Sequence, residues 1–260
     1  MQKKTAPVLA SLATALLFIC APVSATVVLV KTSLGNFEVN LFDQTTPATV
    51  NNFLAYVKNG SYQNTVFHRS VKGFVLQGGG FRFSGDNNAP FVAVPQLAAI
   101  TNEPKLSNVR GTIAMAKVSG NPNSATNQWF INLSDNSANL DLQNGGFTVF
   151  GQVTGTGMEI IDSISNLPNN LNTNYPEVPL RNYTAADGTA KTPVTSNNLV
   201  MIESITVINA EVNTASGLNP KTNTLITSTP ASGSGGSSGG SLGWFSLLAG
   251  ALLVWRRRSC

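Results

Sequence analysis

The clearest periodic segment near the start of the chain alternates apolar and polar residues. Residues 37–42, with the sequence FEVNLF, repeat every two positions, which predicts a half-buried β-strand. A helix is predicted to follow, because Thr46 can cap free backbone N–H groups and Pro47 fits the first helical turn. The next apolar residues are spaced as on one face of a helix: Val50, Phe53, Leu54 and Val57. Gly60 lies just past the expected end of this helix.

Short apolar runs continue along the chain as far as residue 208. Strands are predicted at residues 66–69, 74–77, 111–117, 128–133, 147–153 and 199–208, and a second short helix around Met158, Ile161 and Ile164. Many short strands with two helices indicate a mainly β fold, a closed barrel with helical covers. Residues 26–210 are long enough for one domain with a substantial core. Within this domain, residues 167–198 are rich in Asn, Pro and Thr and predict a long surface loop.

Residues 1–25 have the pattern of a secretory signal peptide. Lys3 and Lys4 precede an apolar segment at residues 12–19, and residues 23–25 (VSA) place small side chains before a cleavage site. An alternative is a lipoprotein signal that ends at Cys20, but Ile19 is bulky where that processing requires a small residue. The sequence therefore predicts an exported protein, located in the periplasm, at the outer cell surface or secreted.

The end of the chain is predicted to lie outside the domain. Residues 211–240 are expected to form a polar linker, since their Gly/Ser run cannot bury apolar surface. Residues 241–260 contain an uncharged apolar span, 242–255, followed by three arginines. As a helix this span would measure roughly 21 Å, short of a hydrocarbon core of ~30 Å. The arrangement resembles the Gly-Gly carboxy-terminal sorting tails of some Gram-negative bacteria, which rhomboid-type proteases cut. A transient contact with the inner membrane is expected, and a permanent membrane anchor is the alternative.

Charge and cysteine content exclude several classes of function once the two ends are set aside. Five of the 16 Lys and Arg residues lie in the end segments and none of the 12 Asp and Glu residues do, so the remainder carries 11 − 12 = −1. No basic patch then argues for binding of nucleic acid. Cys20 and Cys260 both lie in the ends, which leaves the domain without a thiol for metal or redox chemistry. His68 is the only histidine, so neither a histidine-based triad nor a zinc site is expected.

Residues 67–81 carry the pattern that is most specific for a function. Their sequence, FHRSVKGFVLQGGGF, resembles the cyclophilin signature F-H-R-x-x-x-G-F-x-x-Q-G-G-x-F at its nine defined positions. Later segments resemble those of bacterial cyclophilins, at residues 111–116 (GTIAMA), 123–132 (NSATNQWFIN) and 147–153 (FTVFGQV). The similarity extends from about Val27 to Ile208. It implies an eight-stranded antiparallel closed β-barrel capped by two α-helices, with peptidyl-prolyl cis-trans isomerase activity.

The three glycines at positions 78–80 could suggest a phosphate-binding loop. No Lys-Ser/Thr pair follows them and no helix is indicated, so that function is not supported. Glycines at this place in a strand pattern predict a close approach of two backbones instead.

The chemistry of proline isomerisation explains the residues of the motif. Amide resonance sets a barrier of ~18–20 kcal/mol to rotation about the X-Pro bond. In the twisted state the prolyl nitrogen becomes pyramidal and gains a lone pair, which a fixed cationic donor stabilises more than either planar state. Arginine suits this role because it stays protonated and holds its donors in a rigid fork. An apolar cup would hold the proline ring and exclude competing water, and no metal or cofactor is needed.

The resemblance assigns these roles to positions of this sequence. The catalytic residues would be Arg69, as the donor, with Phe74 and Gln77. The residues expected to bind substrate are Val75, Ala116, Lys117, Gln128, Phe130, Leu140 and Phe147. The proline cup would consist of the two motif residues Phe74 and Val75 together with Phe130, Leu140 and Phe147. Both glutamines would orient the peptide, and Ala116 with Lys117 would line the groove beside the residue before proline. The expected partners are proline-containing segments of exported proteins, bound by a monomer.

Several positions depart from the family pattern, and three of them lie in or beside the predicted cup. Val75 stands where many relatives have Met, Asn139 where Trp or Phe is usual, and Phe147 where His or Tyr is found. The change at Asn139 weakens the expectation of cyclosporin binding. These changes leave open a module that binds proline-containing segments with little turnover, and the tail leaves open a surface-displayed structural domain. For Arg69 the alternative to a catalytic donor is an ordinary salt bridge.

Overall fold

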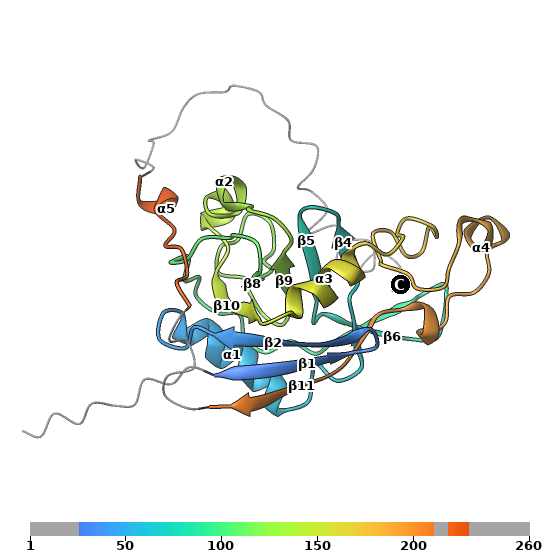
Figure 1. The fold of residues 1–260 in the computed structure, drawn as a ribbon, viewed down its shortest axis with the longest axis horizontal. Coiled ribbons are helices and arrows are strands. Elements are labelled where there is room, and N and C mark those ends of the chain that lie inside the picture. Colours follow the sequence, from blue (N-terminus) through green and yellow to red (C-terminus); the bar gives the residue numbers. More distant parts are fainter. Residues whose placement is uncertain (1–25, 211–217, 229–260) are drawn as a thin grey trace, which may run out of the picture.

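The described part of the protein is residues 26–210 and 218–228 of a computed structural model. The predicted signal peptide, much of the predicted linker and the 241–260 tail lie outside these residues. Figure 1 shows one strongly curled sheet with helices around it.

The strands are β1 (Val27–Thr32), β2 (Gly35–Leu41), β3 (Thr65–Val66), β4 (Arg69–Val71), β5 (Val75–Gly78), β6 (Phe81–Phe83), β7 (Phe91–Ala93), β8 (Thr112–Met115), β9 (Trp129–Asn132), β10 (Val149–Thr154) and β11 (Met201–Asn209). The helices are α1 (Pro47–Lys58), α2 (Ser137–Leu140), α3 (Gly157–Ser165), α4 (Ala185–Ala190) and α5 (Leu225–Ser228), with 3-10 turns η1 (Gln143–Gly145) and η2 (Ser196–Asn198). The two helices predicted from apolar spacing correspond to α1 and α3 and are confirmed, but the Thr46 side chain makes no capping hydrogen bond to α1.

The sheet is mainly antiparallel, as predicted, but it has more strands than expected and does not close. Its eleven strands have the order β4-β5-β9-β8-β10-β2-β1-β11-β3-β6-β7, with β4 and β7 at its two ends. The implied eight-stranded closed barrel is therefore corrected to an open, curled sheet. The reason lies between β3 and β4: the Phe67 N–H donates to the Val200 carbonyl at 3.1 Å, while the His68 N–H donates to the Gln77 carbonyl at 3.2 Å. Consecutive residues thus link two distant parts of the sheet by single hydrogen bonds and form no ladder there.

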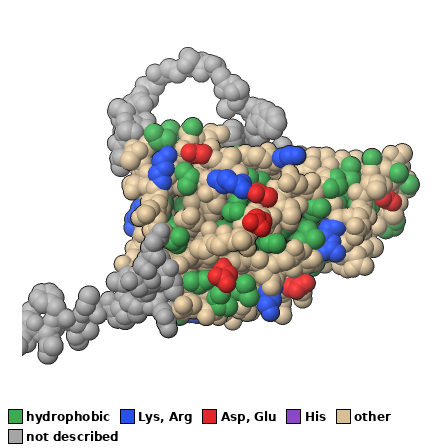
Figure 2. All heavy atoms as spheres, viewed as in Figure 1, with side chains coloured by type: hydrophobic (Ala, Val, Ile, Leu, Met, Phe, Trp, Pro, Cys, Tyr) green, Lys and Arg blue, Asp and Glu red, His purple; other side chains and the backbone are tan. Residues whose placement is uncertain are grey.

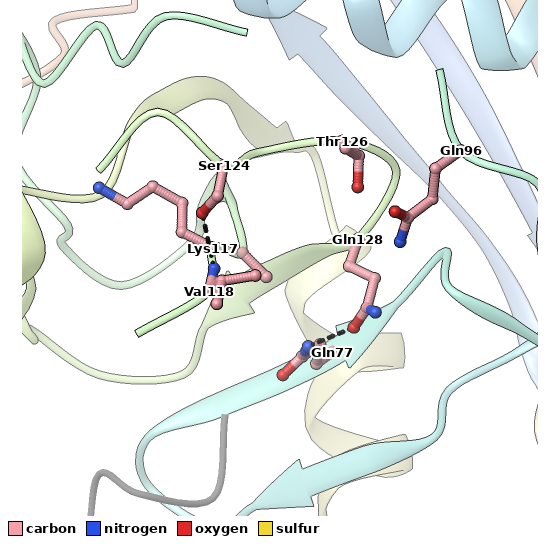
Figure 3. Close-up of a pocket in the computed structure, with 8 residues that line it drawn as sticks. Gln77, Gln96, Lys117, Val118, Ser124, Thr126 and Gln128 are labelled. Carbon is pink, nitrogen blue, oxygen red and sulfur yellow. Dashed lines mark hydrogen bonds between the residues drawn. The ribbon is translucent and has the colours of Figure 1, made fainter. Parts of the chain in front are cut away.

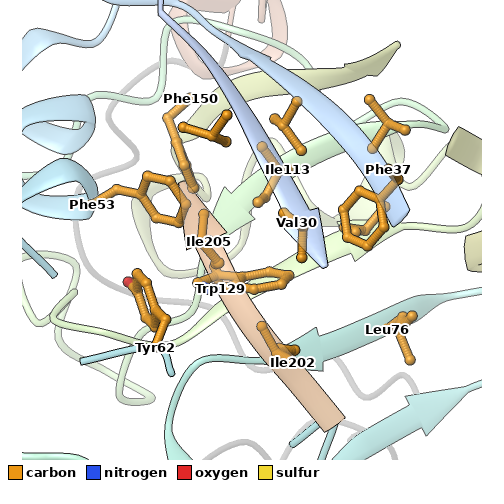
Figure 4. Packing of buried hydrophobic residues seen from close by; sticks show 14 of the residues in the cluster. Val30, Phe37, Phe53, Tyr62, Leu76, Ile113, Trp129, Phe150, Ile202 and Ile205 are labelled. Atoms are coloured by element: carbon orange, nitrogen blue, oxygen red, sulfur yellow. The ribbon is translucent and has the colours of Figure 1, made fainter. Parts of the chain in front are cut away.

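The main core fills the inside of the curled sheet. Trp129 of β9 is fully buried at its centre, with its ring edge-on to Phe67 at 5.8 Å and to Tyr62 at 6.4 Å between centroids. Figure 4 shows residues from distant strands and from α1 around this indole, among them Val30, Phe53 and Ile205. This core fixes the strands whose other faces carry the predicted site.

The segment between α3 and β11, residues 166–200, is packed rather than a simple surface loop. We call it the insertion. It has a hydrophobic cluster of its own, which includes buried Tyr175, Val178 and Leu180 and reaches Val66 of β3. The insertion also contains α4 and η2. Its polar composition predicted a surface loop because the few apolar residues are spread between Asn, Pro and Thr.

Part of the predicted linker also packs on the domain. Residues 218–228, which we call the strap, form an antiparallel bridge at Thr222 with Leu106. The Ser107 N–H donates to the Lys221 carbonyl at 2.8 Å, and the Asn223 N–H donates to the Lys105 carbonyl at 2.9 Å. The strap then ends in α5, on the side of the molecule where α2 lies (Figure 1). For these residues the prediction of a linker is wrong. A buried asparagine and backbone pairing hold them on the domain, and neither produces the apolar stripe by which a packed segment is recognised in a sequence.

The surface carries few charges. On the face shown in Figure 2, lysines, arginines and acidic side chains are scattered among uncharged atoms and do not gather by sign. Among the helices of the described segments, none has the length and apolar character needed to cross a membrane. Those segments also contain no group of three or more His, Cys, Asp or Glu side chains placed to hold a metal ion.

Candidate active site

The register of three neighbouring strands collects three of the predicted site residues on one face of the sheet. Arg69 of β4 lies opposite Gln77 of β5, and Gln77 lies opposite Phe130 of β9. Successive side chains in a strand point to opposite faces. The intervening residues Leu76 and Ile131 accordingly belong to the main core. The two-residue period thus separates the residues of the candidate site from those that stabilise the fold.

The residues predicted to form the proline cup lie in a second apolar cluster on this face. Val75, Phe130, Leu140 and Phe147 are all buried in it, and Phe74 packs against it partly buried. The rings of Phe130 and Phe147 meet edge-on with centroids 5.8 Å apart. Ala116 also belongs to the cluster, as do four residues for which the sequence motifs predict no role: Phe42, Leu106, Ala114 and Val149.

Lys117 holds the turn that carries Phe147. Its ammonium donates to the carbonyls of Asn144 at 2.8 Å and Gly146 at 2.6 Å, and lies 4.8 Å from the centroid of the Phe147 ring. Burial lowers the pKa of Lys117 to about 8. In Figure 3 its side chain runs away from the two glutamines. The stem of Lys117 therefore lies beside the groove, while its charge is directed into the 143–147 turn.

A small cavity of about 70 Å³ lies next to the cup. Four predicted residues line it: Gln77, Ala116, Lys117 and Gln128. The Gln77 side-chain amide donates from Nε2 to Oε1 of Gln128 at 2.9 Å, which orients both glutamines (Figure 3). The remaining lining residues, Gln96, Val118, Ser124 and Thr126, were missed because they lie in irregular segments outside the periodic runs.

Arg69 has both a partner and a free donor. Its Nε atom lies 2.8 Å from Oε2 of Glu177 in the insertion, and its side chain is 12% exposed. Its Nη1 atom is buried and has no hydrogen-bond partner among the described residues, and the same holds for Oε1 of Gln77 across the strand pair. Buried polar groups are nearly always hydrogen-bonded. This donor and this acceptor are therefore suited to a ligand that would satisfy both.

His68 is not placed to act as a general acid or base. Its ring meets Phe81 edge-on at 4.8 Å between centroids. Burial lowers the pKa of His68 to about 4, although hydrogen bonds to the Val66 backbone and the Gln128 side chain act in the opposite direction. The imidazole is thus neutral near pH 7 and belongs to the packing behind the site.

Two of the three motif glycines lie where a side chain would not fit. A Cβ atom on Gly79 would come within 2.6 Å of the Asn127 carbonyl oxygen, and one on Gly80 within 2.6 Å of the Gln128 side chain. The predicted close approach of two backbones is found at Gly79, whereas the close neighbour of Gly80 is a side chain. The approach also brings Gln128 toward the strand that holds Gln77.

Asn139 stands exposed in α2, one residue before buried Leu140. The resemblance places an aromatic residue at this position. The cup therefore lacks an aromatic side chain at that point of its rim.

Comparison with known proteins identifies the family. The model of the family described as cyclophilin type peptidyl-prolyl cis-trans isomerase/CLD matches residues 27–185. The chain belongs to the cyclophilin family. Its function is that of a peptidyl-prolyl cis-trans isomerase.

Several bacterial proteins are similar over most of their own length. A peptidyl-prolyl cis-trans isomerase of Acinetobacter baylyi is 41% identical over 162 residues, which cover 60% of this chain and 82% of that protein. Peptidyl-prolyl cis-trans isomerase A of Dickeya dadantii is 44% identical over 161 residues, covering 61% and 81%. Peptidyl-prolyl cis-trans isomerase B of Escherichia coli is 38% identical over 154 residues, covering 57% and 89%.

The fold is also found among solved structures. A cyclophilin type peptidyl-prolyl cis-trans isomerase from Cryptosporidium parvum superposes with a TM-score of 0.51 at 23% identity, covering 71% of this chain and 98% of that one. At this identity the likeness concerns the fold alone, a curled antiparallel sheet with a few helices.

Proposed function

We propose that this cyclophilin isomerises X-Pro bonds in flexible segments of exported proteins, with Arg69 as the catalytic donor. The observation that carries the proposal is the buried, unpartnered Nη1 atom of Arg69 on the same sheet face as the cup. A donor kept dry and unpaired loses no hydrogen bond when the prolyl nitrogen becomes pyramidal.

The cup would hold the proline ring against Phe130 while the peptide lies along the two glutamines. Oε1 of Gln77 would accept a backbone N–H of the substrate, since it is buried without a partner among the described residues. Removing water from the ring and the arginine strengthens the hydrogen bond to the twisted amide. A ten-thousandfold acceleration corresponds to about 5.5 kcal/mol, which a charged hydrogen bond with desolvation can supply.

The decisive experiment compares the purified protein with Arg69→Ala on a proline-containing test peptide, by NMR exchange spectroscopy. We expect the rate of isomerisation to fall about a hundredfold or more, because the removed donor acts only in the twisted state. Arg110→Ala is the matched control, since Arg110 also forms a salt bridge, but its partner is Asp162 of α3 and neither residue belongs to the apolar cluster of the cup. Isomerisation at the spontaneous rate by the unaltered protein would refute the proposal.

A second candidate function is a module that binds proline-containing segments with little turnover. It is favoured by one observation: Arg69 already has an acidic partner in Glu177. Peptide binding that persists in Arg69→Ala, without accelerated exchange in the unaltered protein, would support this function over catalysis.

The location of the protein is part of the proposal and rests on the two ends of the sequence. The signal-like residues 1–25 support export, and residues 241–260 support a transient contact with the inner membrane before release or display. Mass spectrometry of the mature protein would read both processed ends. Cell fractionation with Arg256, Arg257 and Arg258 replaced by Ala tests the tail, and an unchanged mass and location would count against sorting. A single species at the monomer mass in light scattering is expected.

A further inference from the structure

The insertion runs along the open edge of the sheet beside Arg69. β4 is the last strand at that end of the sheet, so one side of its backbone has no strand neighbour. The Ser70 N–H donates to the Glu177 carbonyl at 2.6 Å, and the Ser70 carbonyl accepts from Nδ2 of Asn169 at 2.8 Å. The insertion therefore takes the place of a further strand next to the arginine.

The backbone at Glu177 is held in a conformation that few residues adopt. Its φ of +58° lies in the left-handed region, which costs a non-glycine residue conformational energy. Its N–H donates to Oδ1 of Asn170 at 3.2 Å, its carbonyl binds Ser70, and the neighbouring Tyr175 and Val178 are buried in the insertion's cluster. Contacts on both sides of Glu177 thus fix the backbone position from which its side chain extends.

From this position the Glu177 carboxylate reaches one specific nitrogen of Arg69. Oε2 lies 2.8 Å from Nε, and the two side chains are 28% and 12% exposed. A guanidinium has five N–H donors in a rigid plane. A contact at Nε therefore fixes the direction of the whole group without occupying the terminal donors, and Nη1 remains buried and unpaired within the described residues.

We propose that Glu177 is a positioning residue, supplied by the insertion, that orients the Arg69 guanidinium so that Nη1 points at the twisted prolyl amide. The inference rests on the proposed role of Arg69. In this arrangement the salt bridge and catalysis are compatible, because they use different nitrogens of one side chain. The insertion then serves the active site as well as the fold.

The test measures isomerisation and peptide binding separately, with NMR exchange on the full chain. For Glu177→Ala we expect kcat/KM to fall about tenfold, the loss of one charge-assisted hydrogen bond. The peptide Kd should stay within about twofold, because the contact acts on the twisted state. Glu177→Gln should recover most of the rate, since its amide oxygen can still accept from Nε.

Two control variants distinguish a positioning role of Glu177 from a general loosening of the insertion. Asp187→Ala removes the capping box that Asp187 forms with Thr184 in α4, which weakens the insertion away from Arg69. Asp162→Asn removes the acidic partner of the surface pair with Arg110. Neither should change the rate by more than about twofold, because an exposed pair contributes little. An equal loss in Asp187→Ala and Glu177→Ala would overturn the proposal.

A second measurement does not depend on activity. The Nε–H proton of Arg69 should exchange slowly with water in the unaltered protein and in Asp187→Ala, and fast in Glu177→Ala. Fast exchange in the unaltered protein would overturn the proposal, and so would an unchanged or higher kcat/KM in Glu177→Ala. An unaltered protein without isomerase activity would instead refute the proposed function itself.

Discussion

His68 follows Phe67 in the signature motif, yet the structure gives it no access to reaction chemistry. Its Nδ1 atom is buried without a hydrogen-bond partner among the described residues, and its ring packs on Phe81. Burial therefore disfavours the protonated form and lowers the pKa of His68 to about 4. The imidazole contributes to stability as a neutral group.

This environment predicts a pH dependence of folding. The pKa of His68 is lowered from an ordinary value of 6.5 to about 4. Between these two pH values the unfolded chain therefore binds a proton at His68 that the folded chain does not bind. The stabilisation is complete above pH 6.5 and is lost as the pH falls toward 4. We expect the free energy of unfolding to drop on the order of 2 kcal/mol over this range relative to His68→Gln.

The measurement is simple because His68 is the only histidine. Its ring-proton NMR signal should titrate near pH 4 in the folded protein, and urea unfolding at several pH values gives the change in stability. A midpoint near 6.5 would show that the ring is solvated and would contradict the prediction.

Residue roles were predictable from the sequence only where the motif is local. The resemblance assigned roles to Arg69, Gln77 and Phe130 because each lies in a contiguous motif, and the strand register of the structure puts them on one face of the sheet. Glu177 could not have been found this way, since it lies 108 positions from the arginine that it binds. A lone acid in an Asn- and Pro-rich segment gives no signal of its partner.

At the level of elements, the strap shows how polar residues can build structure. Asn223 is 3% exposed, and its side-chain amide donates to the Asp141 carbonyl at 2.9 Å while its Oδ1 accepts the N–H groups of Leu225 and Ile226. Asp141 directly follows α2, which carries Leu140 of the cup. The strap therefore supports the outer wall of the cup.

Replacing Asn223 by Ala should release the strap while the sheet stays folded. Removal of the side chain leaves the Asp141 carbonyl unpaired in the interior, at an expected cost of about 1–3 kcal/mol. The Ser107 amide, whose acceptor is the Lys221 carbonyl, should then exchange faster with solvent. Hydrogen exchange read by NMR or mass spectrometry tests this, with exposed Asn219→Ala in the same strap as the control. Equal protection of Ser107 in both variants would contradict a supporting role.

The strap was predicted as linker for a reason that applies to elements in general. Hydrophobic periodicity detects segments that bury apolar side chains, and residues 218–228 show no such period. The contact of Asn223 with Asp141 spans 82 positions and uses a polar side chain. The helices α1 and α3, by contrast, bury apolar faces at regular spacing and were predicted from the sequence.

At the scale of the whole molecule, the curl of the sheet depends on a few corners that strand patterns do not show. Short strands and antiparallel pairing were predictable, but the number of strands and the opening between β4 and β7 were not. Both features depend on the points at which the chain stops pairing with one neighbouring strand and turns toward another. One such corner lies between β5 and β6, at the motif glycines.

Replacing Gly79 by Ala should therefore destabilise the protein far more than the same replacement at a glycine of the same backbone conformation elsewhere. Gly79 and Gly85 have φ values of +84° and +85°, but a Cβ atom on Gly79 would lie 2.6 Å from the Asn127 oxygen and 2.7 Å from Nε1 of Trp129, while Gly85 has open space. In both variants the left-handed conformation of the alanine should lower the free energy of unfolding by about 1–2 kcal/mol. Gly79→Ala should lower it by about 1–3 kcal/mol more, because the new Cβ atom overlaps with the central tryptophan. Thermal unfolding should show a Tm lower by roughly 2–4 °C per kcal/mol in each case. Equal losses of Tm would mean that the corner can relax and that the curl of the sheet does not depend on this close approach.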